Sequence, residues 1–280
     1  MKYIYLFVLS LSTFLSWSQR SKSPVINFWS LEVSHVFDFG FVQKLKPVNS
    51  FYYNQGIEEQ NIIALKGIRT FQDQQTKLPA LRLSYHRHTR LKLGLNFSLG
   101  YQNLPGSYLS QEIHTLLNGY NYQGLDFMKI NTSAFSFGLS ARLPLSKIPF
   151  KTAITLGFEY SLLHSQINRQ RTLTNPNKHI LIKEKGNYFS AAPSFFIGIG
   201  KRFLIGNNKA LEAGLRFNIV PENRKLFTEA DGWFTNENPT SSETPKINPN
   251  ALRYHAHYLL KNFLNYEVYF SFTLFNVQYK

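Results

Sequence analysis

Eight segments of the chain alternate between apolar and polar residues, and this alternation limits the possible fold more than any other feature. Successive side chains of a β-strand point to opposite faces, so a period of two marks a strand with one apolar face. The clearest segment, residues 91–101, has large apolar residues at odd positions and polar or small ones at even positions. The eight segments are residues 29–39, 81–86, 91–101, 135–143, 154–162, 189–202, 211–219 and 266–274.

The connections between these segments alternate between short and long. Short connections lie around residues 86–90, 144–150 and 204–209, and long ones cover residues 40–77, 102–126, 165–187 and 221–262. Long structureless loops are uncommon in compact soluble domains. Outer-membrane barrels, in contrast, combine short periplasmic turns with long extracellular loops. The sequence therefore predicts an all-β fold, an eight-stranded antiparallel up-and-down transmembrane β-barrel. We expect one short helix in the second long loop, from Ser110 to Gly119.

The first 18 residues have the features of a secretory signal peptide. Lys2 is followed by an apolar stretch over residues 3–15, and Ser16 and Ser18 are the small residues of a cleavage site. The apolar stretch is too short to span a membrane as a helix. We predict an exported chain that is cleaved near Ser18, with residues 1–18 as signal peptide and residues 19–280 as the barrel domain.

These features together suggest a family. With its signal peptide, eight alternating strands and unequal connections, the chain resembles over residues 25–280 the small outer-membrane β-barrels of Gram-negative bacteria, such as the OmpA membrane domain and the porin-family barrels. The resemblance rests on pattern and not on a signature motif, and it implies a location in the bacterial outer membrane. One departure is the C-terminus: such chains often end in an outward-facing aromatic residue, whereas this chain ends in Tyr279 and Lys280.

A soluble lipocalin-type barrel is the main structural alternative, because it also has eight strands and follows a signal peptide. Its apolar face points inward and its polar face meets water. The polar face of the present strands is rich in Gly, Ser and Ala and carries about one charge per strand. Small residues suit the narrow interior of an eight-stranded barrel. The membrane barrel is therefore the favoured interpretation.

The polar face carries equal numbers of acidic and basic residues. Charges in a narrow interior must pair or be hydrated, because an isolated ion there costs several kcal/mol. Equal numbers of both signs predict a closed, ion-paired interior and not the single-sign ring of a selective pore. The members of this predicted charge network are Glu32, Asp38, Arg82, Lys92, Arg142, Glu159, Arg202, Glu212, Arg216 and Glu267.

The net charge of +15, from 31 basic and 16 acidic residues, is typical of proteins that bind nucleic acid. Export argues against a nucleic-acid partner, and many of the bases lie at the short-turn end. There we expect a periplasmic rim in contact with anionic headgroups, formed by Arg87, Arg90, Lys147, Lys151, Lys201 and Lys209. The expected partners are outer-membrane lipids. For the basic third long loop, contact with lipopolysaccharide phosphates and simple solvation both stay open; its basic residues are Arg169, Arg171, Lys178, Lys183 and Lys185. Trp233 and Phe234 of the fourth long loop either contact a protein partner or rest on the mouth of the barrel.

The sequence offers no convincing catalytic or cofactor site. The chain has no cysteine, and Ser34 and His35 adjoin on one strand, where neighbours point to opposite faces. His255 and His257 are expected on one face of a strand, but two ligands without a third are a weak metal signal. Their neighbours Tyr254 and Tyr258 suggest an interfacial aromatic belt instead. We expect no catalytic residues, metal or cofactor.

The predicted function is that of a closed barrel with a structural or surface-interaction role through its long extracellular loops. Three alternatives stay open. The first is a small-solute, porin-like channel, and the second is an accessory barrel in protein secretion. The third and weakest is a lipid-modifying enzyme of the outer membrane.

Overall fold

The computed structural model describes residues 26–37, 62–72, 79–88, 93–117, 120–145, 152–205, 209–221, 234–235, 246–263, 266–274 and 278–279. Most of these residues form strands: β1 (Ile26–Phe37), β2 (Ile62–Gln72), β3 (Ala80–His88), β4 (Gly94–Leu117), β5 (Tyr120–Pro144), β6 (Thr152–Asn175), β7 (Lys178–Ile205), β8 (Lys209–Ile219), β9 (Phe234–Thr235), β10 (Lys246–Ile247), β11 (Tyr266–Thr273) and β12 (Gln278–Tyr279). A helix, α3, covers Pro249–Phe263. Within these ranges, no helix is long and apolar enough to cross a bilayer.

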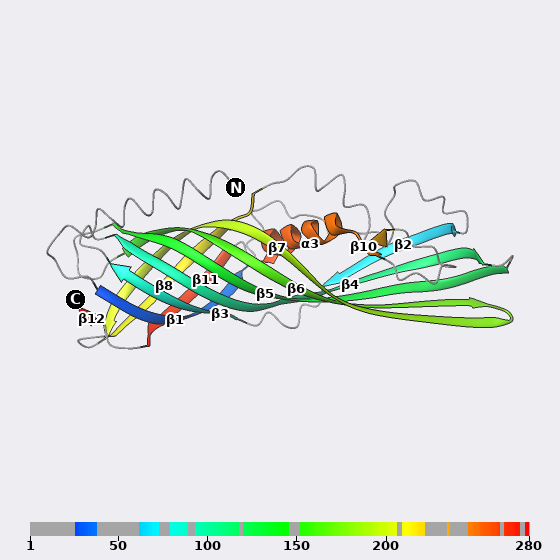
Figure 1. The fold of residues 1–280 in the computed structure, drawn as a ribbon, viewed down its shortest axis with the longest axis horizontal. Coiled ribbons are helices and arrows are strands. Elements are labelled where there is room, and N and C mark those ends of the chain that lie inside the picture. Colours follow the sequence, from blue (N-terminus) through cyan, green and yellow to red (C-terminus); the bar gives the residue numbers. More distant parts are fainter. Residues whose placement is uncertain are drawn as a thin grey trace.

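Eight antiparallel strands close into a ring (Figure 1). The order is β1, β3, β4, β5, β6, β7, β8 and β11, and β11 pairs back with β1 through partners such as Leu31 and Phe272. Each of the eight alternating segments of the sequence contributes one strand of this ring. The short β12 adds to the start of β1. The all-β, antiparallel prediction with eight principal strands is therefore confirmed.

The two faces of the ring strands differ sharply in polarity. Along β6, Thr155, Glu159 and Ser161 point inward and are buried, whereas Leu156 and Leu162 point outward and are exposed. The same alternation holds on the other ring strands. Polar groups therefore fill the interior and apolar groups cover the exterior, which is the reverse of the lipocalin-type arrangement.

All four predicted long loops contain regular structure. Residues 102–126 and 165–187 belong to long hairpins, β2 lies within residues 40–77, and most of α3 lies within residues 221–262. β4 and β5 pair from Gly94 opposite Arg142 to Leu117 opposite Tyr120, with one register shift between Leu104 and Ser107. β6 and β7 pair without a shift as far as Asn175 and Lys178. The expected helix at Ser110 is also wrong, since Ser110 lies in β4 opposite Phe127.

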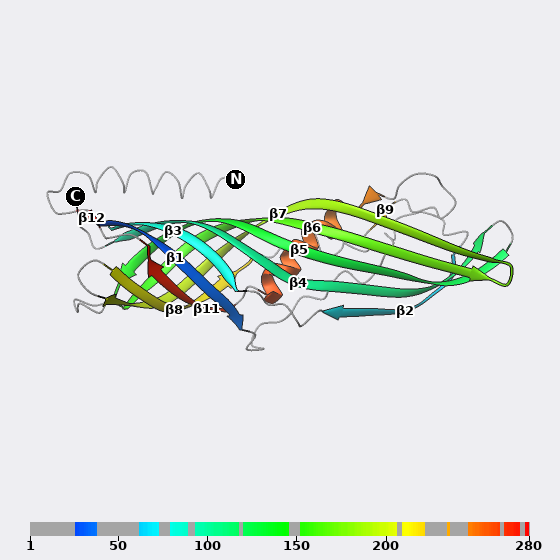
Figure 2. The same cartoon turned by 90° about the horizontal axis from the view of Figure 1, so that it is seen from below.

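The alternation continues in these hairpins, but here the inner face carries apolar residues and the outer face polar ones. Because the pattern differs from that of the ring strands, these strand segments are not predicted from the sequence. On β5, Met128 and Ile130 point to the inner face and are buried, while Lys129 and Asn131 lie on the outer face. β2 pairs with β4 beyond the ring. The strands β4, β5, β6 and β7 thus continue past the ring and, together with β2, form an open sheet, here called the extension (Figure 2).

Helix α3 packs on the inner face of the extension, close to the ring. Tyr254 packs with Met128 and Ile167, and Tyr258 lies in a second buried cluster with Leu163 and Ala192. The strand expected at His255 and His257 is therefore wrong, and the two tyrosines are core residues and not an exterior aromatic belt. The missed signal was the cap: Asn248 accepts a hydrogen bond of 2.9 Å from the Asn250 amide, and Pro249 occupies the first helical position.

The buried imidazole of His255 generates a prediction about pH. Burial lowers the pKa of His255 from its ordinary 6.5 to about 4. When α3 is undocked, His255 takes up a proton below pH 6.5, whereas in the docked helix it stays neutral down to about pH 4. The docked state is therefore fully stabilised above pH 6.5 and loses about 3 kcal/mol of stability as the pH falls toward 4. Hydrogen exchange of α3, corrected for its intrinsic pH dependence, should show less protection at pH 4.5 than at pH 7. The variant H255F should remove this difference.

The variant H179F is a matched control, because His179 is exposed beside the β6–β7 turn. It should keep the pH dependence of the wild type. An equal loss of α3 protection in H255F and wild type would show that another group controls the docking of the helix.

Candidate functional site

The first of two ion clusters in the ring interior joins two arginines to three glutamates. Arg82 Nη1 lies 2.7 Å from Glu267 Oε2 and 3.1 Å from Glu32 Oε1, and Arg82 Nη2 lies 3.4 Å from Glu159 Oε2. Arg216 donates from both Nη atoms to Glu32, at 2.9 and 3.0 Å. The five side chains come from β1, β3, β6, β8 and β11, so the cluster ties opposite walls of the ring together.

Neutral groups complete this first cluster. Asn218 Nδ2 donates to Glu267 Oε1 at 2.9 Å, and Ser34 Oγ accepts from Arg82 at 3.2 Å. Glu267 and Arg82 are almost fully buried. Ions removed from water are tolerated only when good geometry and further hydrogen bonds offset the lost hydration. The cluster meets this requirement, and its formal charge is −1.

The second cluster has the opposite sign. Glu212 Oε2 lies 2.7 Å from Arg202 and 3.4 Å from Arg142. The Tyr269 hydroxyl donates to Glu212 Oε1 at 3.1 Å, and the Tyr269 ring lies 5.0 Å from the Arg216 guanidinium of the first cluster. Tyr269 therefore connects the clusters. One glutamate and two arginines give a formal charge of +1, so these four acids and four bases balance.

The predicted charge network can be compared with these contacts. Eight of its ten members line the ring interior and take part in the two clusters. The other two, Asp38 and Lys92, lie outside the described residues. Most of the pairing could not be read from the sequence, because partners such as Arg82 and Glu267 lie on strands far apart in the chain. Arg202 and Glu212, which are cross-strand partners in the β7–β8 hairpin, are an exception.

His86 belongs to the ring interior, although it borders the short connection that the sequence predicts around residues 86–90. It lies on β3, where Nδ1 is 2.7 Å from Asn96 Oδ1 and Nε2 is 2.6 Å from Ser30 Oγ. An amide oxygen only accepts, so Nδ1–H donates to Asn96 and Nε2 accepts from the Ser30 hydroxyl. The imidazole stacks on Phe28 at 4.4 Å, and the Arg202 guanidinium lies 4.8 Å from the Phe28 ring. His86 thus extends the second cluster toward the end of the ring.

A small polar cavity lies between the clusters. It measures about 30 Å³, and its walls include Ser84, His86, Glu159, Glu212 and Tyr269. A cavity of this size holds roughly two water molecules. This cavity has no room for a solute larger than water.

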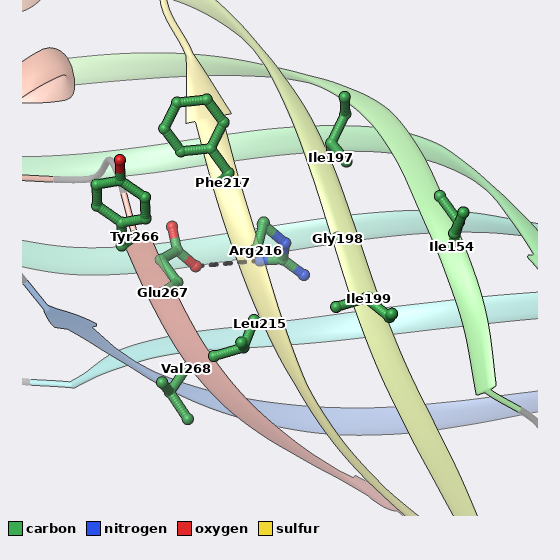
Figure 3. Close-up of a pocket in the computed structure, with 10 residues that line it drawn as sticks. All are labelled: Ile154, Ile197, Gly198, Ile199, Leu215, Arg216, Phe217, Tyr266, Glu267 and Val268. Carbon is green, nitrogen blue, oxygen red and sulfur yellow. Dashed lines mark hydrogen bonds and ion pairs between the residues drawn. The ribbon is translucent and has the colours of Figure 1, made fainter. Parts of the chain in front are cut away.

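The outer wall of the ring has an apolar groove of about 340 Å³ on β7, β8 and β11 (Figure 3). Ile197, Ile199, Leu215 and Phe217 line it, while the Arg216–Glu267 pair belongs to the inner side of the same strands. The groove is a concave part of the apolar exterior. Its chemistry fits hydrocarbon and offers no convergent polar group that would orient a polar ligand.

The predicted basic rim is described only in part. Lys201 and Lys209 are exposed where β7 and β8 meet, and Arg87 is half-buried near the end of β3. Arg90, Lys147 and Lys151 lie outside the described residues. The described members share one end of the ring, opposite the extension.

The basic third loop must be corrected, because two of its arginines are buried in the extension. Arg169 Nε donates to Asp126 Oδ1 at 2.8 Å, and Arg171 donates to Asp126 Oδ2 from Nη2 at 2.8 Å. Arg169 also lies 3.3 Å from Glu184. These two guanidiniums face inward and are neutralised. They are not available for an external anion, whereas Lys183 and Lys185 remain exposed.

The described residues contain no group of three or more His, Asp or Glu side chains placed to hold a metal ion. Ser34 is buried inside the ring and His35 is exposed on its outer face, so these neighbours do not form a nucleophile and base. No protein-family model matches the chain, and no curated protein is significantly similar to it.

The first ion cluster generates a prediction about stability. The substitution Arg82→Met leaves three carboxylates with one arginine, and the loss of one partner from a buried ion pair costs about 3–5 kcal/mol. The double variant R82M/E267Q restores the original formal charge of the cluster and should recover part of that loss. Urea unfolding in detergent micelles measures both free energies. If the double variant were as unstable as R82M, the hydrogen bonds of the first cluster, and not its charge balance, would determine its contribution to stability.

Proposed function

We propose that this chain is a bacterial outer-membrane β-barrel whose ring spans the bilayer and whose ion-paired interior is closed. In this proposal the extension lies outside the cell, where it serves a structural or surface-interaction role. The observation that carries the proposal is the inverted polarity of the ring, with charges packed inside and large apolar side chains exposed outside.

Every ring strand contributes to this apolar exterior. Monomeric soluble proteins rarely expose apolar patches larger than a few hundred Å². A closed ring also satisfies its backbone hydrogen bonds internally, as hydrocarbon requires. One exposed side chain from each ring strand, in ring order, illustrates the apolar band: Trp29, Leu83, Phe97, Phe137, Leu156, Ile197, Leu215 and Phe270.

The orientation follows from the unequal ends. In outer-membrane barrels the short turns face the periplasm and the long connections face outward. The end with Lys201 and Lys209 would then be periplasmic, and the extension with α3 extracellular. Export through a signal peptide over residues 1–18 is part of this proposal, and those residues lie outside the described part of the chain.

A lipid-face variant tests the membrane proposal. Leu156→Arg places a charge on the outer face of the ring, where a mid-bilayer arginine costs about 2–4 kcal/mol. The matched control is Asn131→Arg, because Asn131 is exposed on the outer face of the extension. L156R should lower the fraction that runs as a heat-modifiable band on SDS gels, and N131R should not.

The same preparations test location. Wild-type protein should be recovered with the outer membrane and released by detergent. Its recovery as soluble protein without detergent, or equal folding of the two arginine variants, would contradict a membrane-spanning ring.

Conductance tests whether the interior is closed. Purified protein in a planar lipid bilayer should show no steady conductance, because the ion clusters lie across the ring interior and the cavity between them holds only about two waters. Steady wild-type conductance, with an ion selectivity that changes in Glu159→Gln, would make the protein a small-solute channel.

A further inference from the structure

We propose that lysines on the outer face of the extension bind the phosphate groups of outer-leaflet lipids. The site consists of Lys129, Asn168 and Lys185 in one row, with Lys183 beside it. This inference rests on the proposed function, because it needs the ring to lie in a bilayer. It replaces the basic third loop of the sequence prediction, whose arginines are buried.

The strand register brings the row together. Lys129 of β5 pairs with Asn168 of β6, and Asn168 pairs with Lys185 of β7. Direct cross-strand partners point to the same face of a sheet. Neighbouring strands lie about 4.8 Å apart, so the Lys129 and Lys185 backbones are about 10 Å apart. Two lysine side chains can converge across this distance on one phosphate, with the Asn168 amide between them.

Lys183 adds a third cation next to this row. It occupies the next outward position of β7, about 7 Å along the strand from Lys185, and it pairs with Gln170, which is also exposed. The outer face therefore combines three ammonium groups with two side-chain amides. Ammonium and amide N–H groups are donors that suit phosphate oxygens.

Among the residues that the structure describes, the three lysines have no internal counter-ion. In the described part of the chain none of them forms an ion pair, and Lys129 Nζ instead lies 5.2 Å from the Tyr108 ring centre. Glu184 stands between Lys183 and Lys185 in sequence but points to the inner face, where it pairs with Arg169. The exposed acid Glu112 lies on β4, three strands from Lys183. An external anion can thus neutralise the row.

The height of the row matches a lipid headgroup. Phe189 is 76% exposed and stacks on His164 at 4.8 Å, at the end of the apolar band nearest the extension. Lys185 precedes Phe189 by four residues, which is about 13 Å along a strand and about 10 Å along the membrane normal at the usual tilt. Lysine side chains extend their charged ends toward the interface while their stems cover apolar surface. The ammonium groups therefore reach the phosphate layer.

Native mass spectrometry of the folded protein in detergent micelles tests this site with bisphosphorylated lipid A as the probe. The double variant K129Q/K185Q should bind it at least tenfold more weakly than wild type, because each basic residue near an anionic surface contributes about 1 kcal/mol. The matched control K201Q/K209Q removes two lysines at the opposite end of the ring and should bind as wild type. Dephosphorylated lipid A should bind all three proteins equally weakly.

Three results would overturn the assignment. The first is that K129Q/K185Q binds lipid A as tightly as wild type does. The second is that inorganic phosphate binds saturably and loses affinity in the same lysine variant. The third is that a polyglutamate peptide binds more tightly than lipid A and depends on the same lysines. Heat-modifiable mobility is checked in each variant. If the wild-type protein did not show heat-modifiable mobility, the proposed outer-membrane barrel would be refuted. If all variants showed it but lipid A binding did not depend on the lysines, only this binding site would be refuted.

Discussion

The ion pairs inside the ring are the interaction on which the rest of the structure depends. A narrow ring of eight strands leaves little room for water, so its arginines and glutamates must neutralise one another. Arg82 contacts three glutamates on three other strands, and Glu267 receives both arginines of its cluster. Arg82–Glu32 and Arg216–Glu267 are direct cross-strand pairs. The pairs Arg82–Glu159, Arg82–Glu267 and Arg216–Glu32 join strands that are not neighbours in the sheet.

The change of polarity between the ring and the extension explains why helix α3 packs on the inner face of the extension. In the ring, inner positions are polar and outer positions are apolar. Past Leu104 and Ala134 the inner face gains Leu109, Met128 and Ile130, which need an apolar partner. Helix α3 supplies that partner by burying Tyr254, Tyr258 and the leucines beside it. The same strands thus have an apolar exterior in one half and an apolar interior in the other, as expected for strands that leave a bilayer and enter water.

Strand prediction succeeded where one face was uniformly apolar and failed where both faces were mixed. The hairpin residues 102–126 and 165–187 alternate too, but Asp126, Arg169 and Arg171 interrupt their inner face, and the pattern was interpreted as loop. The helix at Pro249–Phe263 was missed although Asn248 and Pro249 form an ordinary N-terminal cap. His86 borders the short connection predicted around residues 86–90, whereas its position on β3 directs it inward to Ser30 and Asn96.

The alternation of apolar and polar residues is sufficient to predict the eight ring strands, the face on which each of their residues lies and the balance of charge on the inner face. These properties are local, because they depend only on the two-residue period of a strand. The tertiary structure alone decided which charges meet. Arg82 and Glu267 are 185 residues apart, and only closure of the ring between β1 and β11 brings them within hydrogen-bonding distance. It also decided that Arg169 is buried while Lys185 is free to meet an anion, since burial depends on the strands and helix that pack against each face.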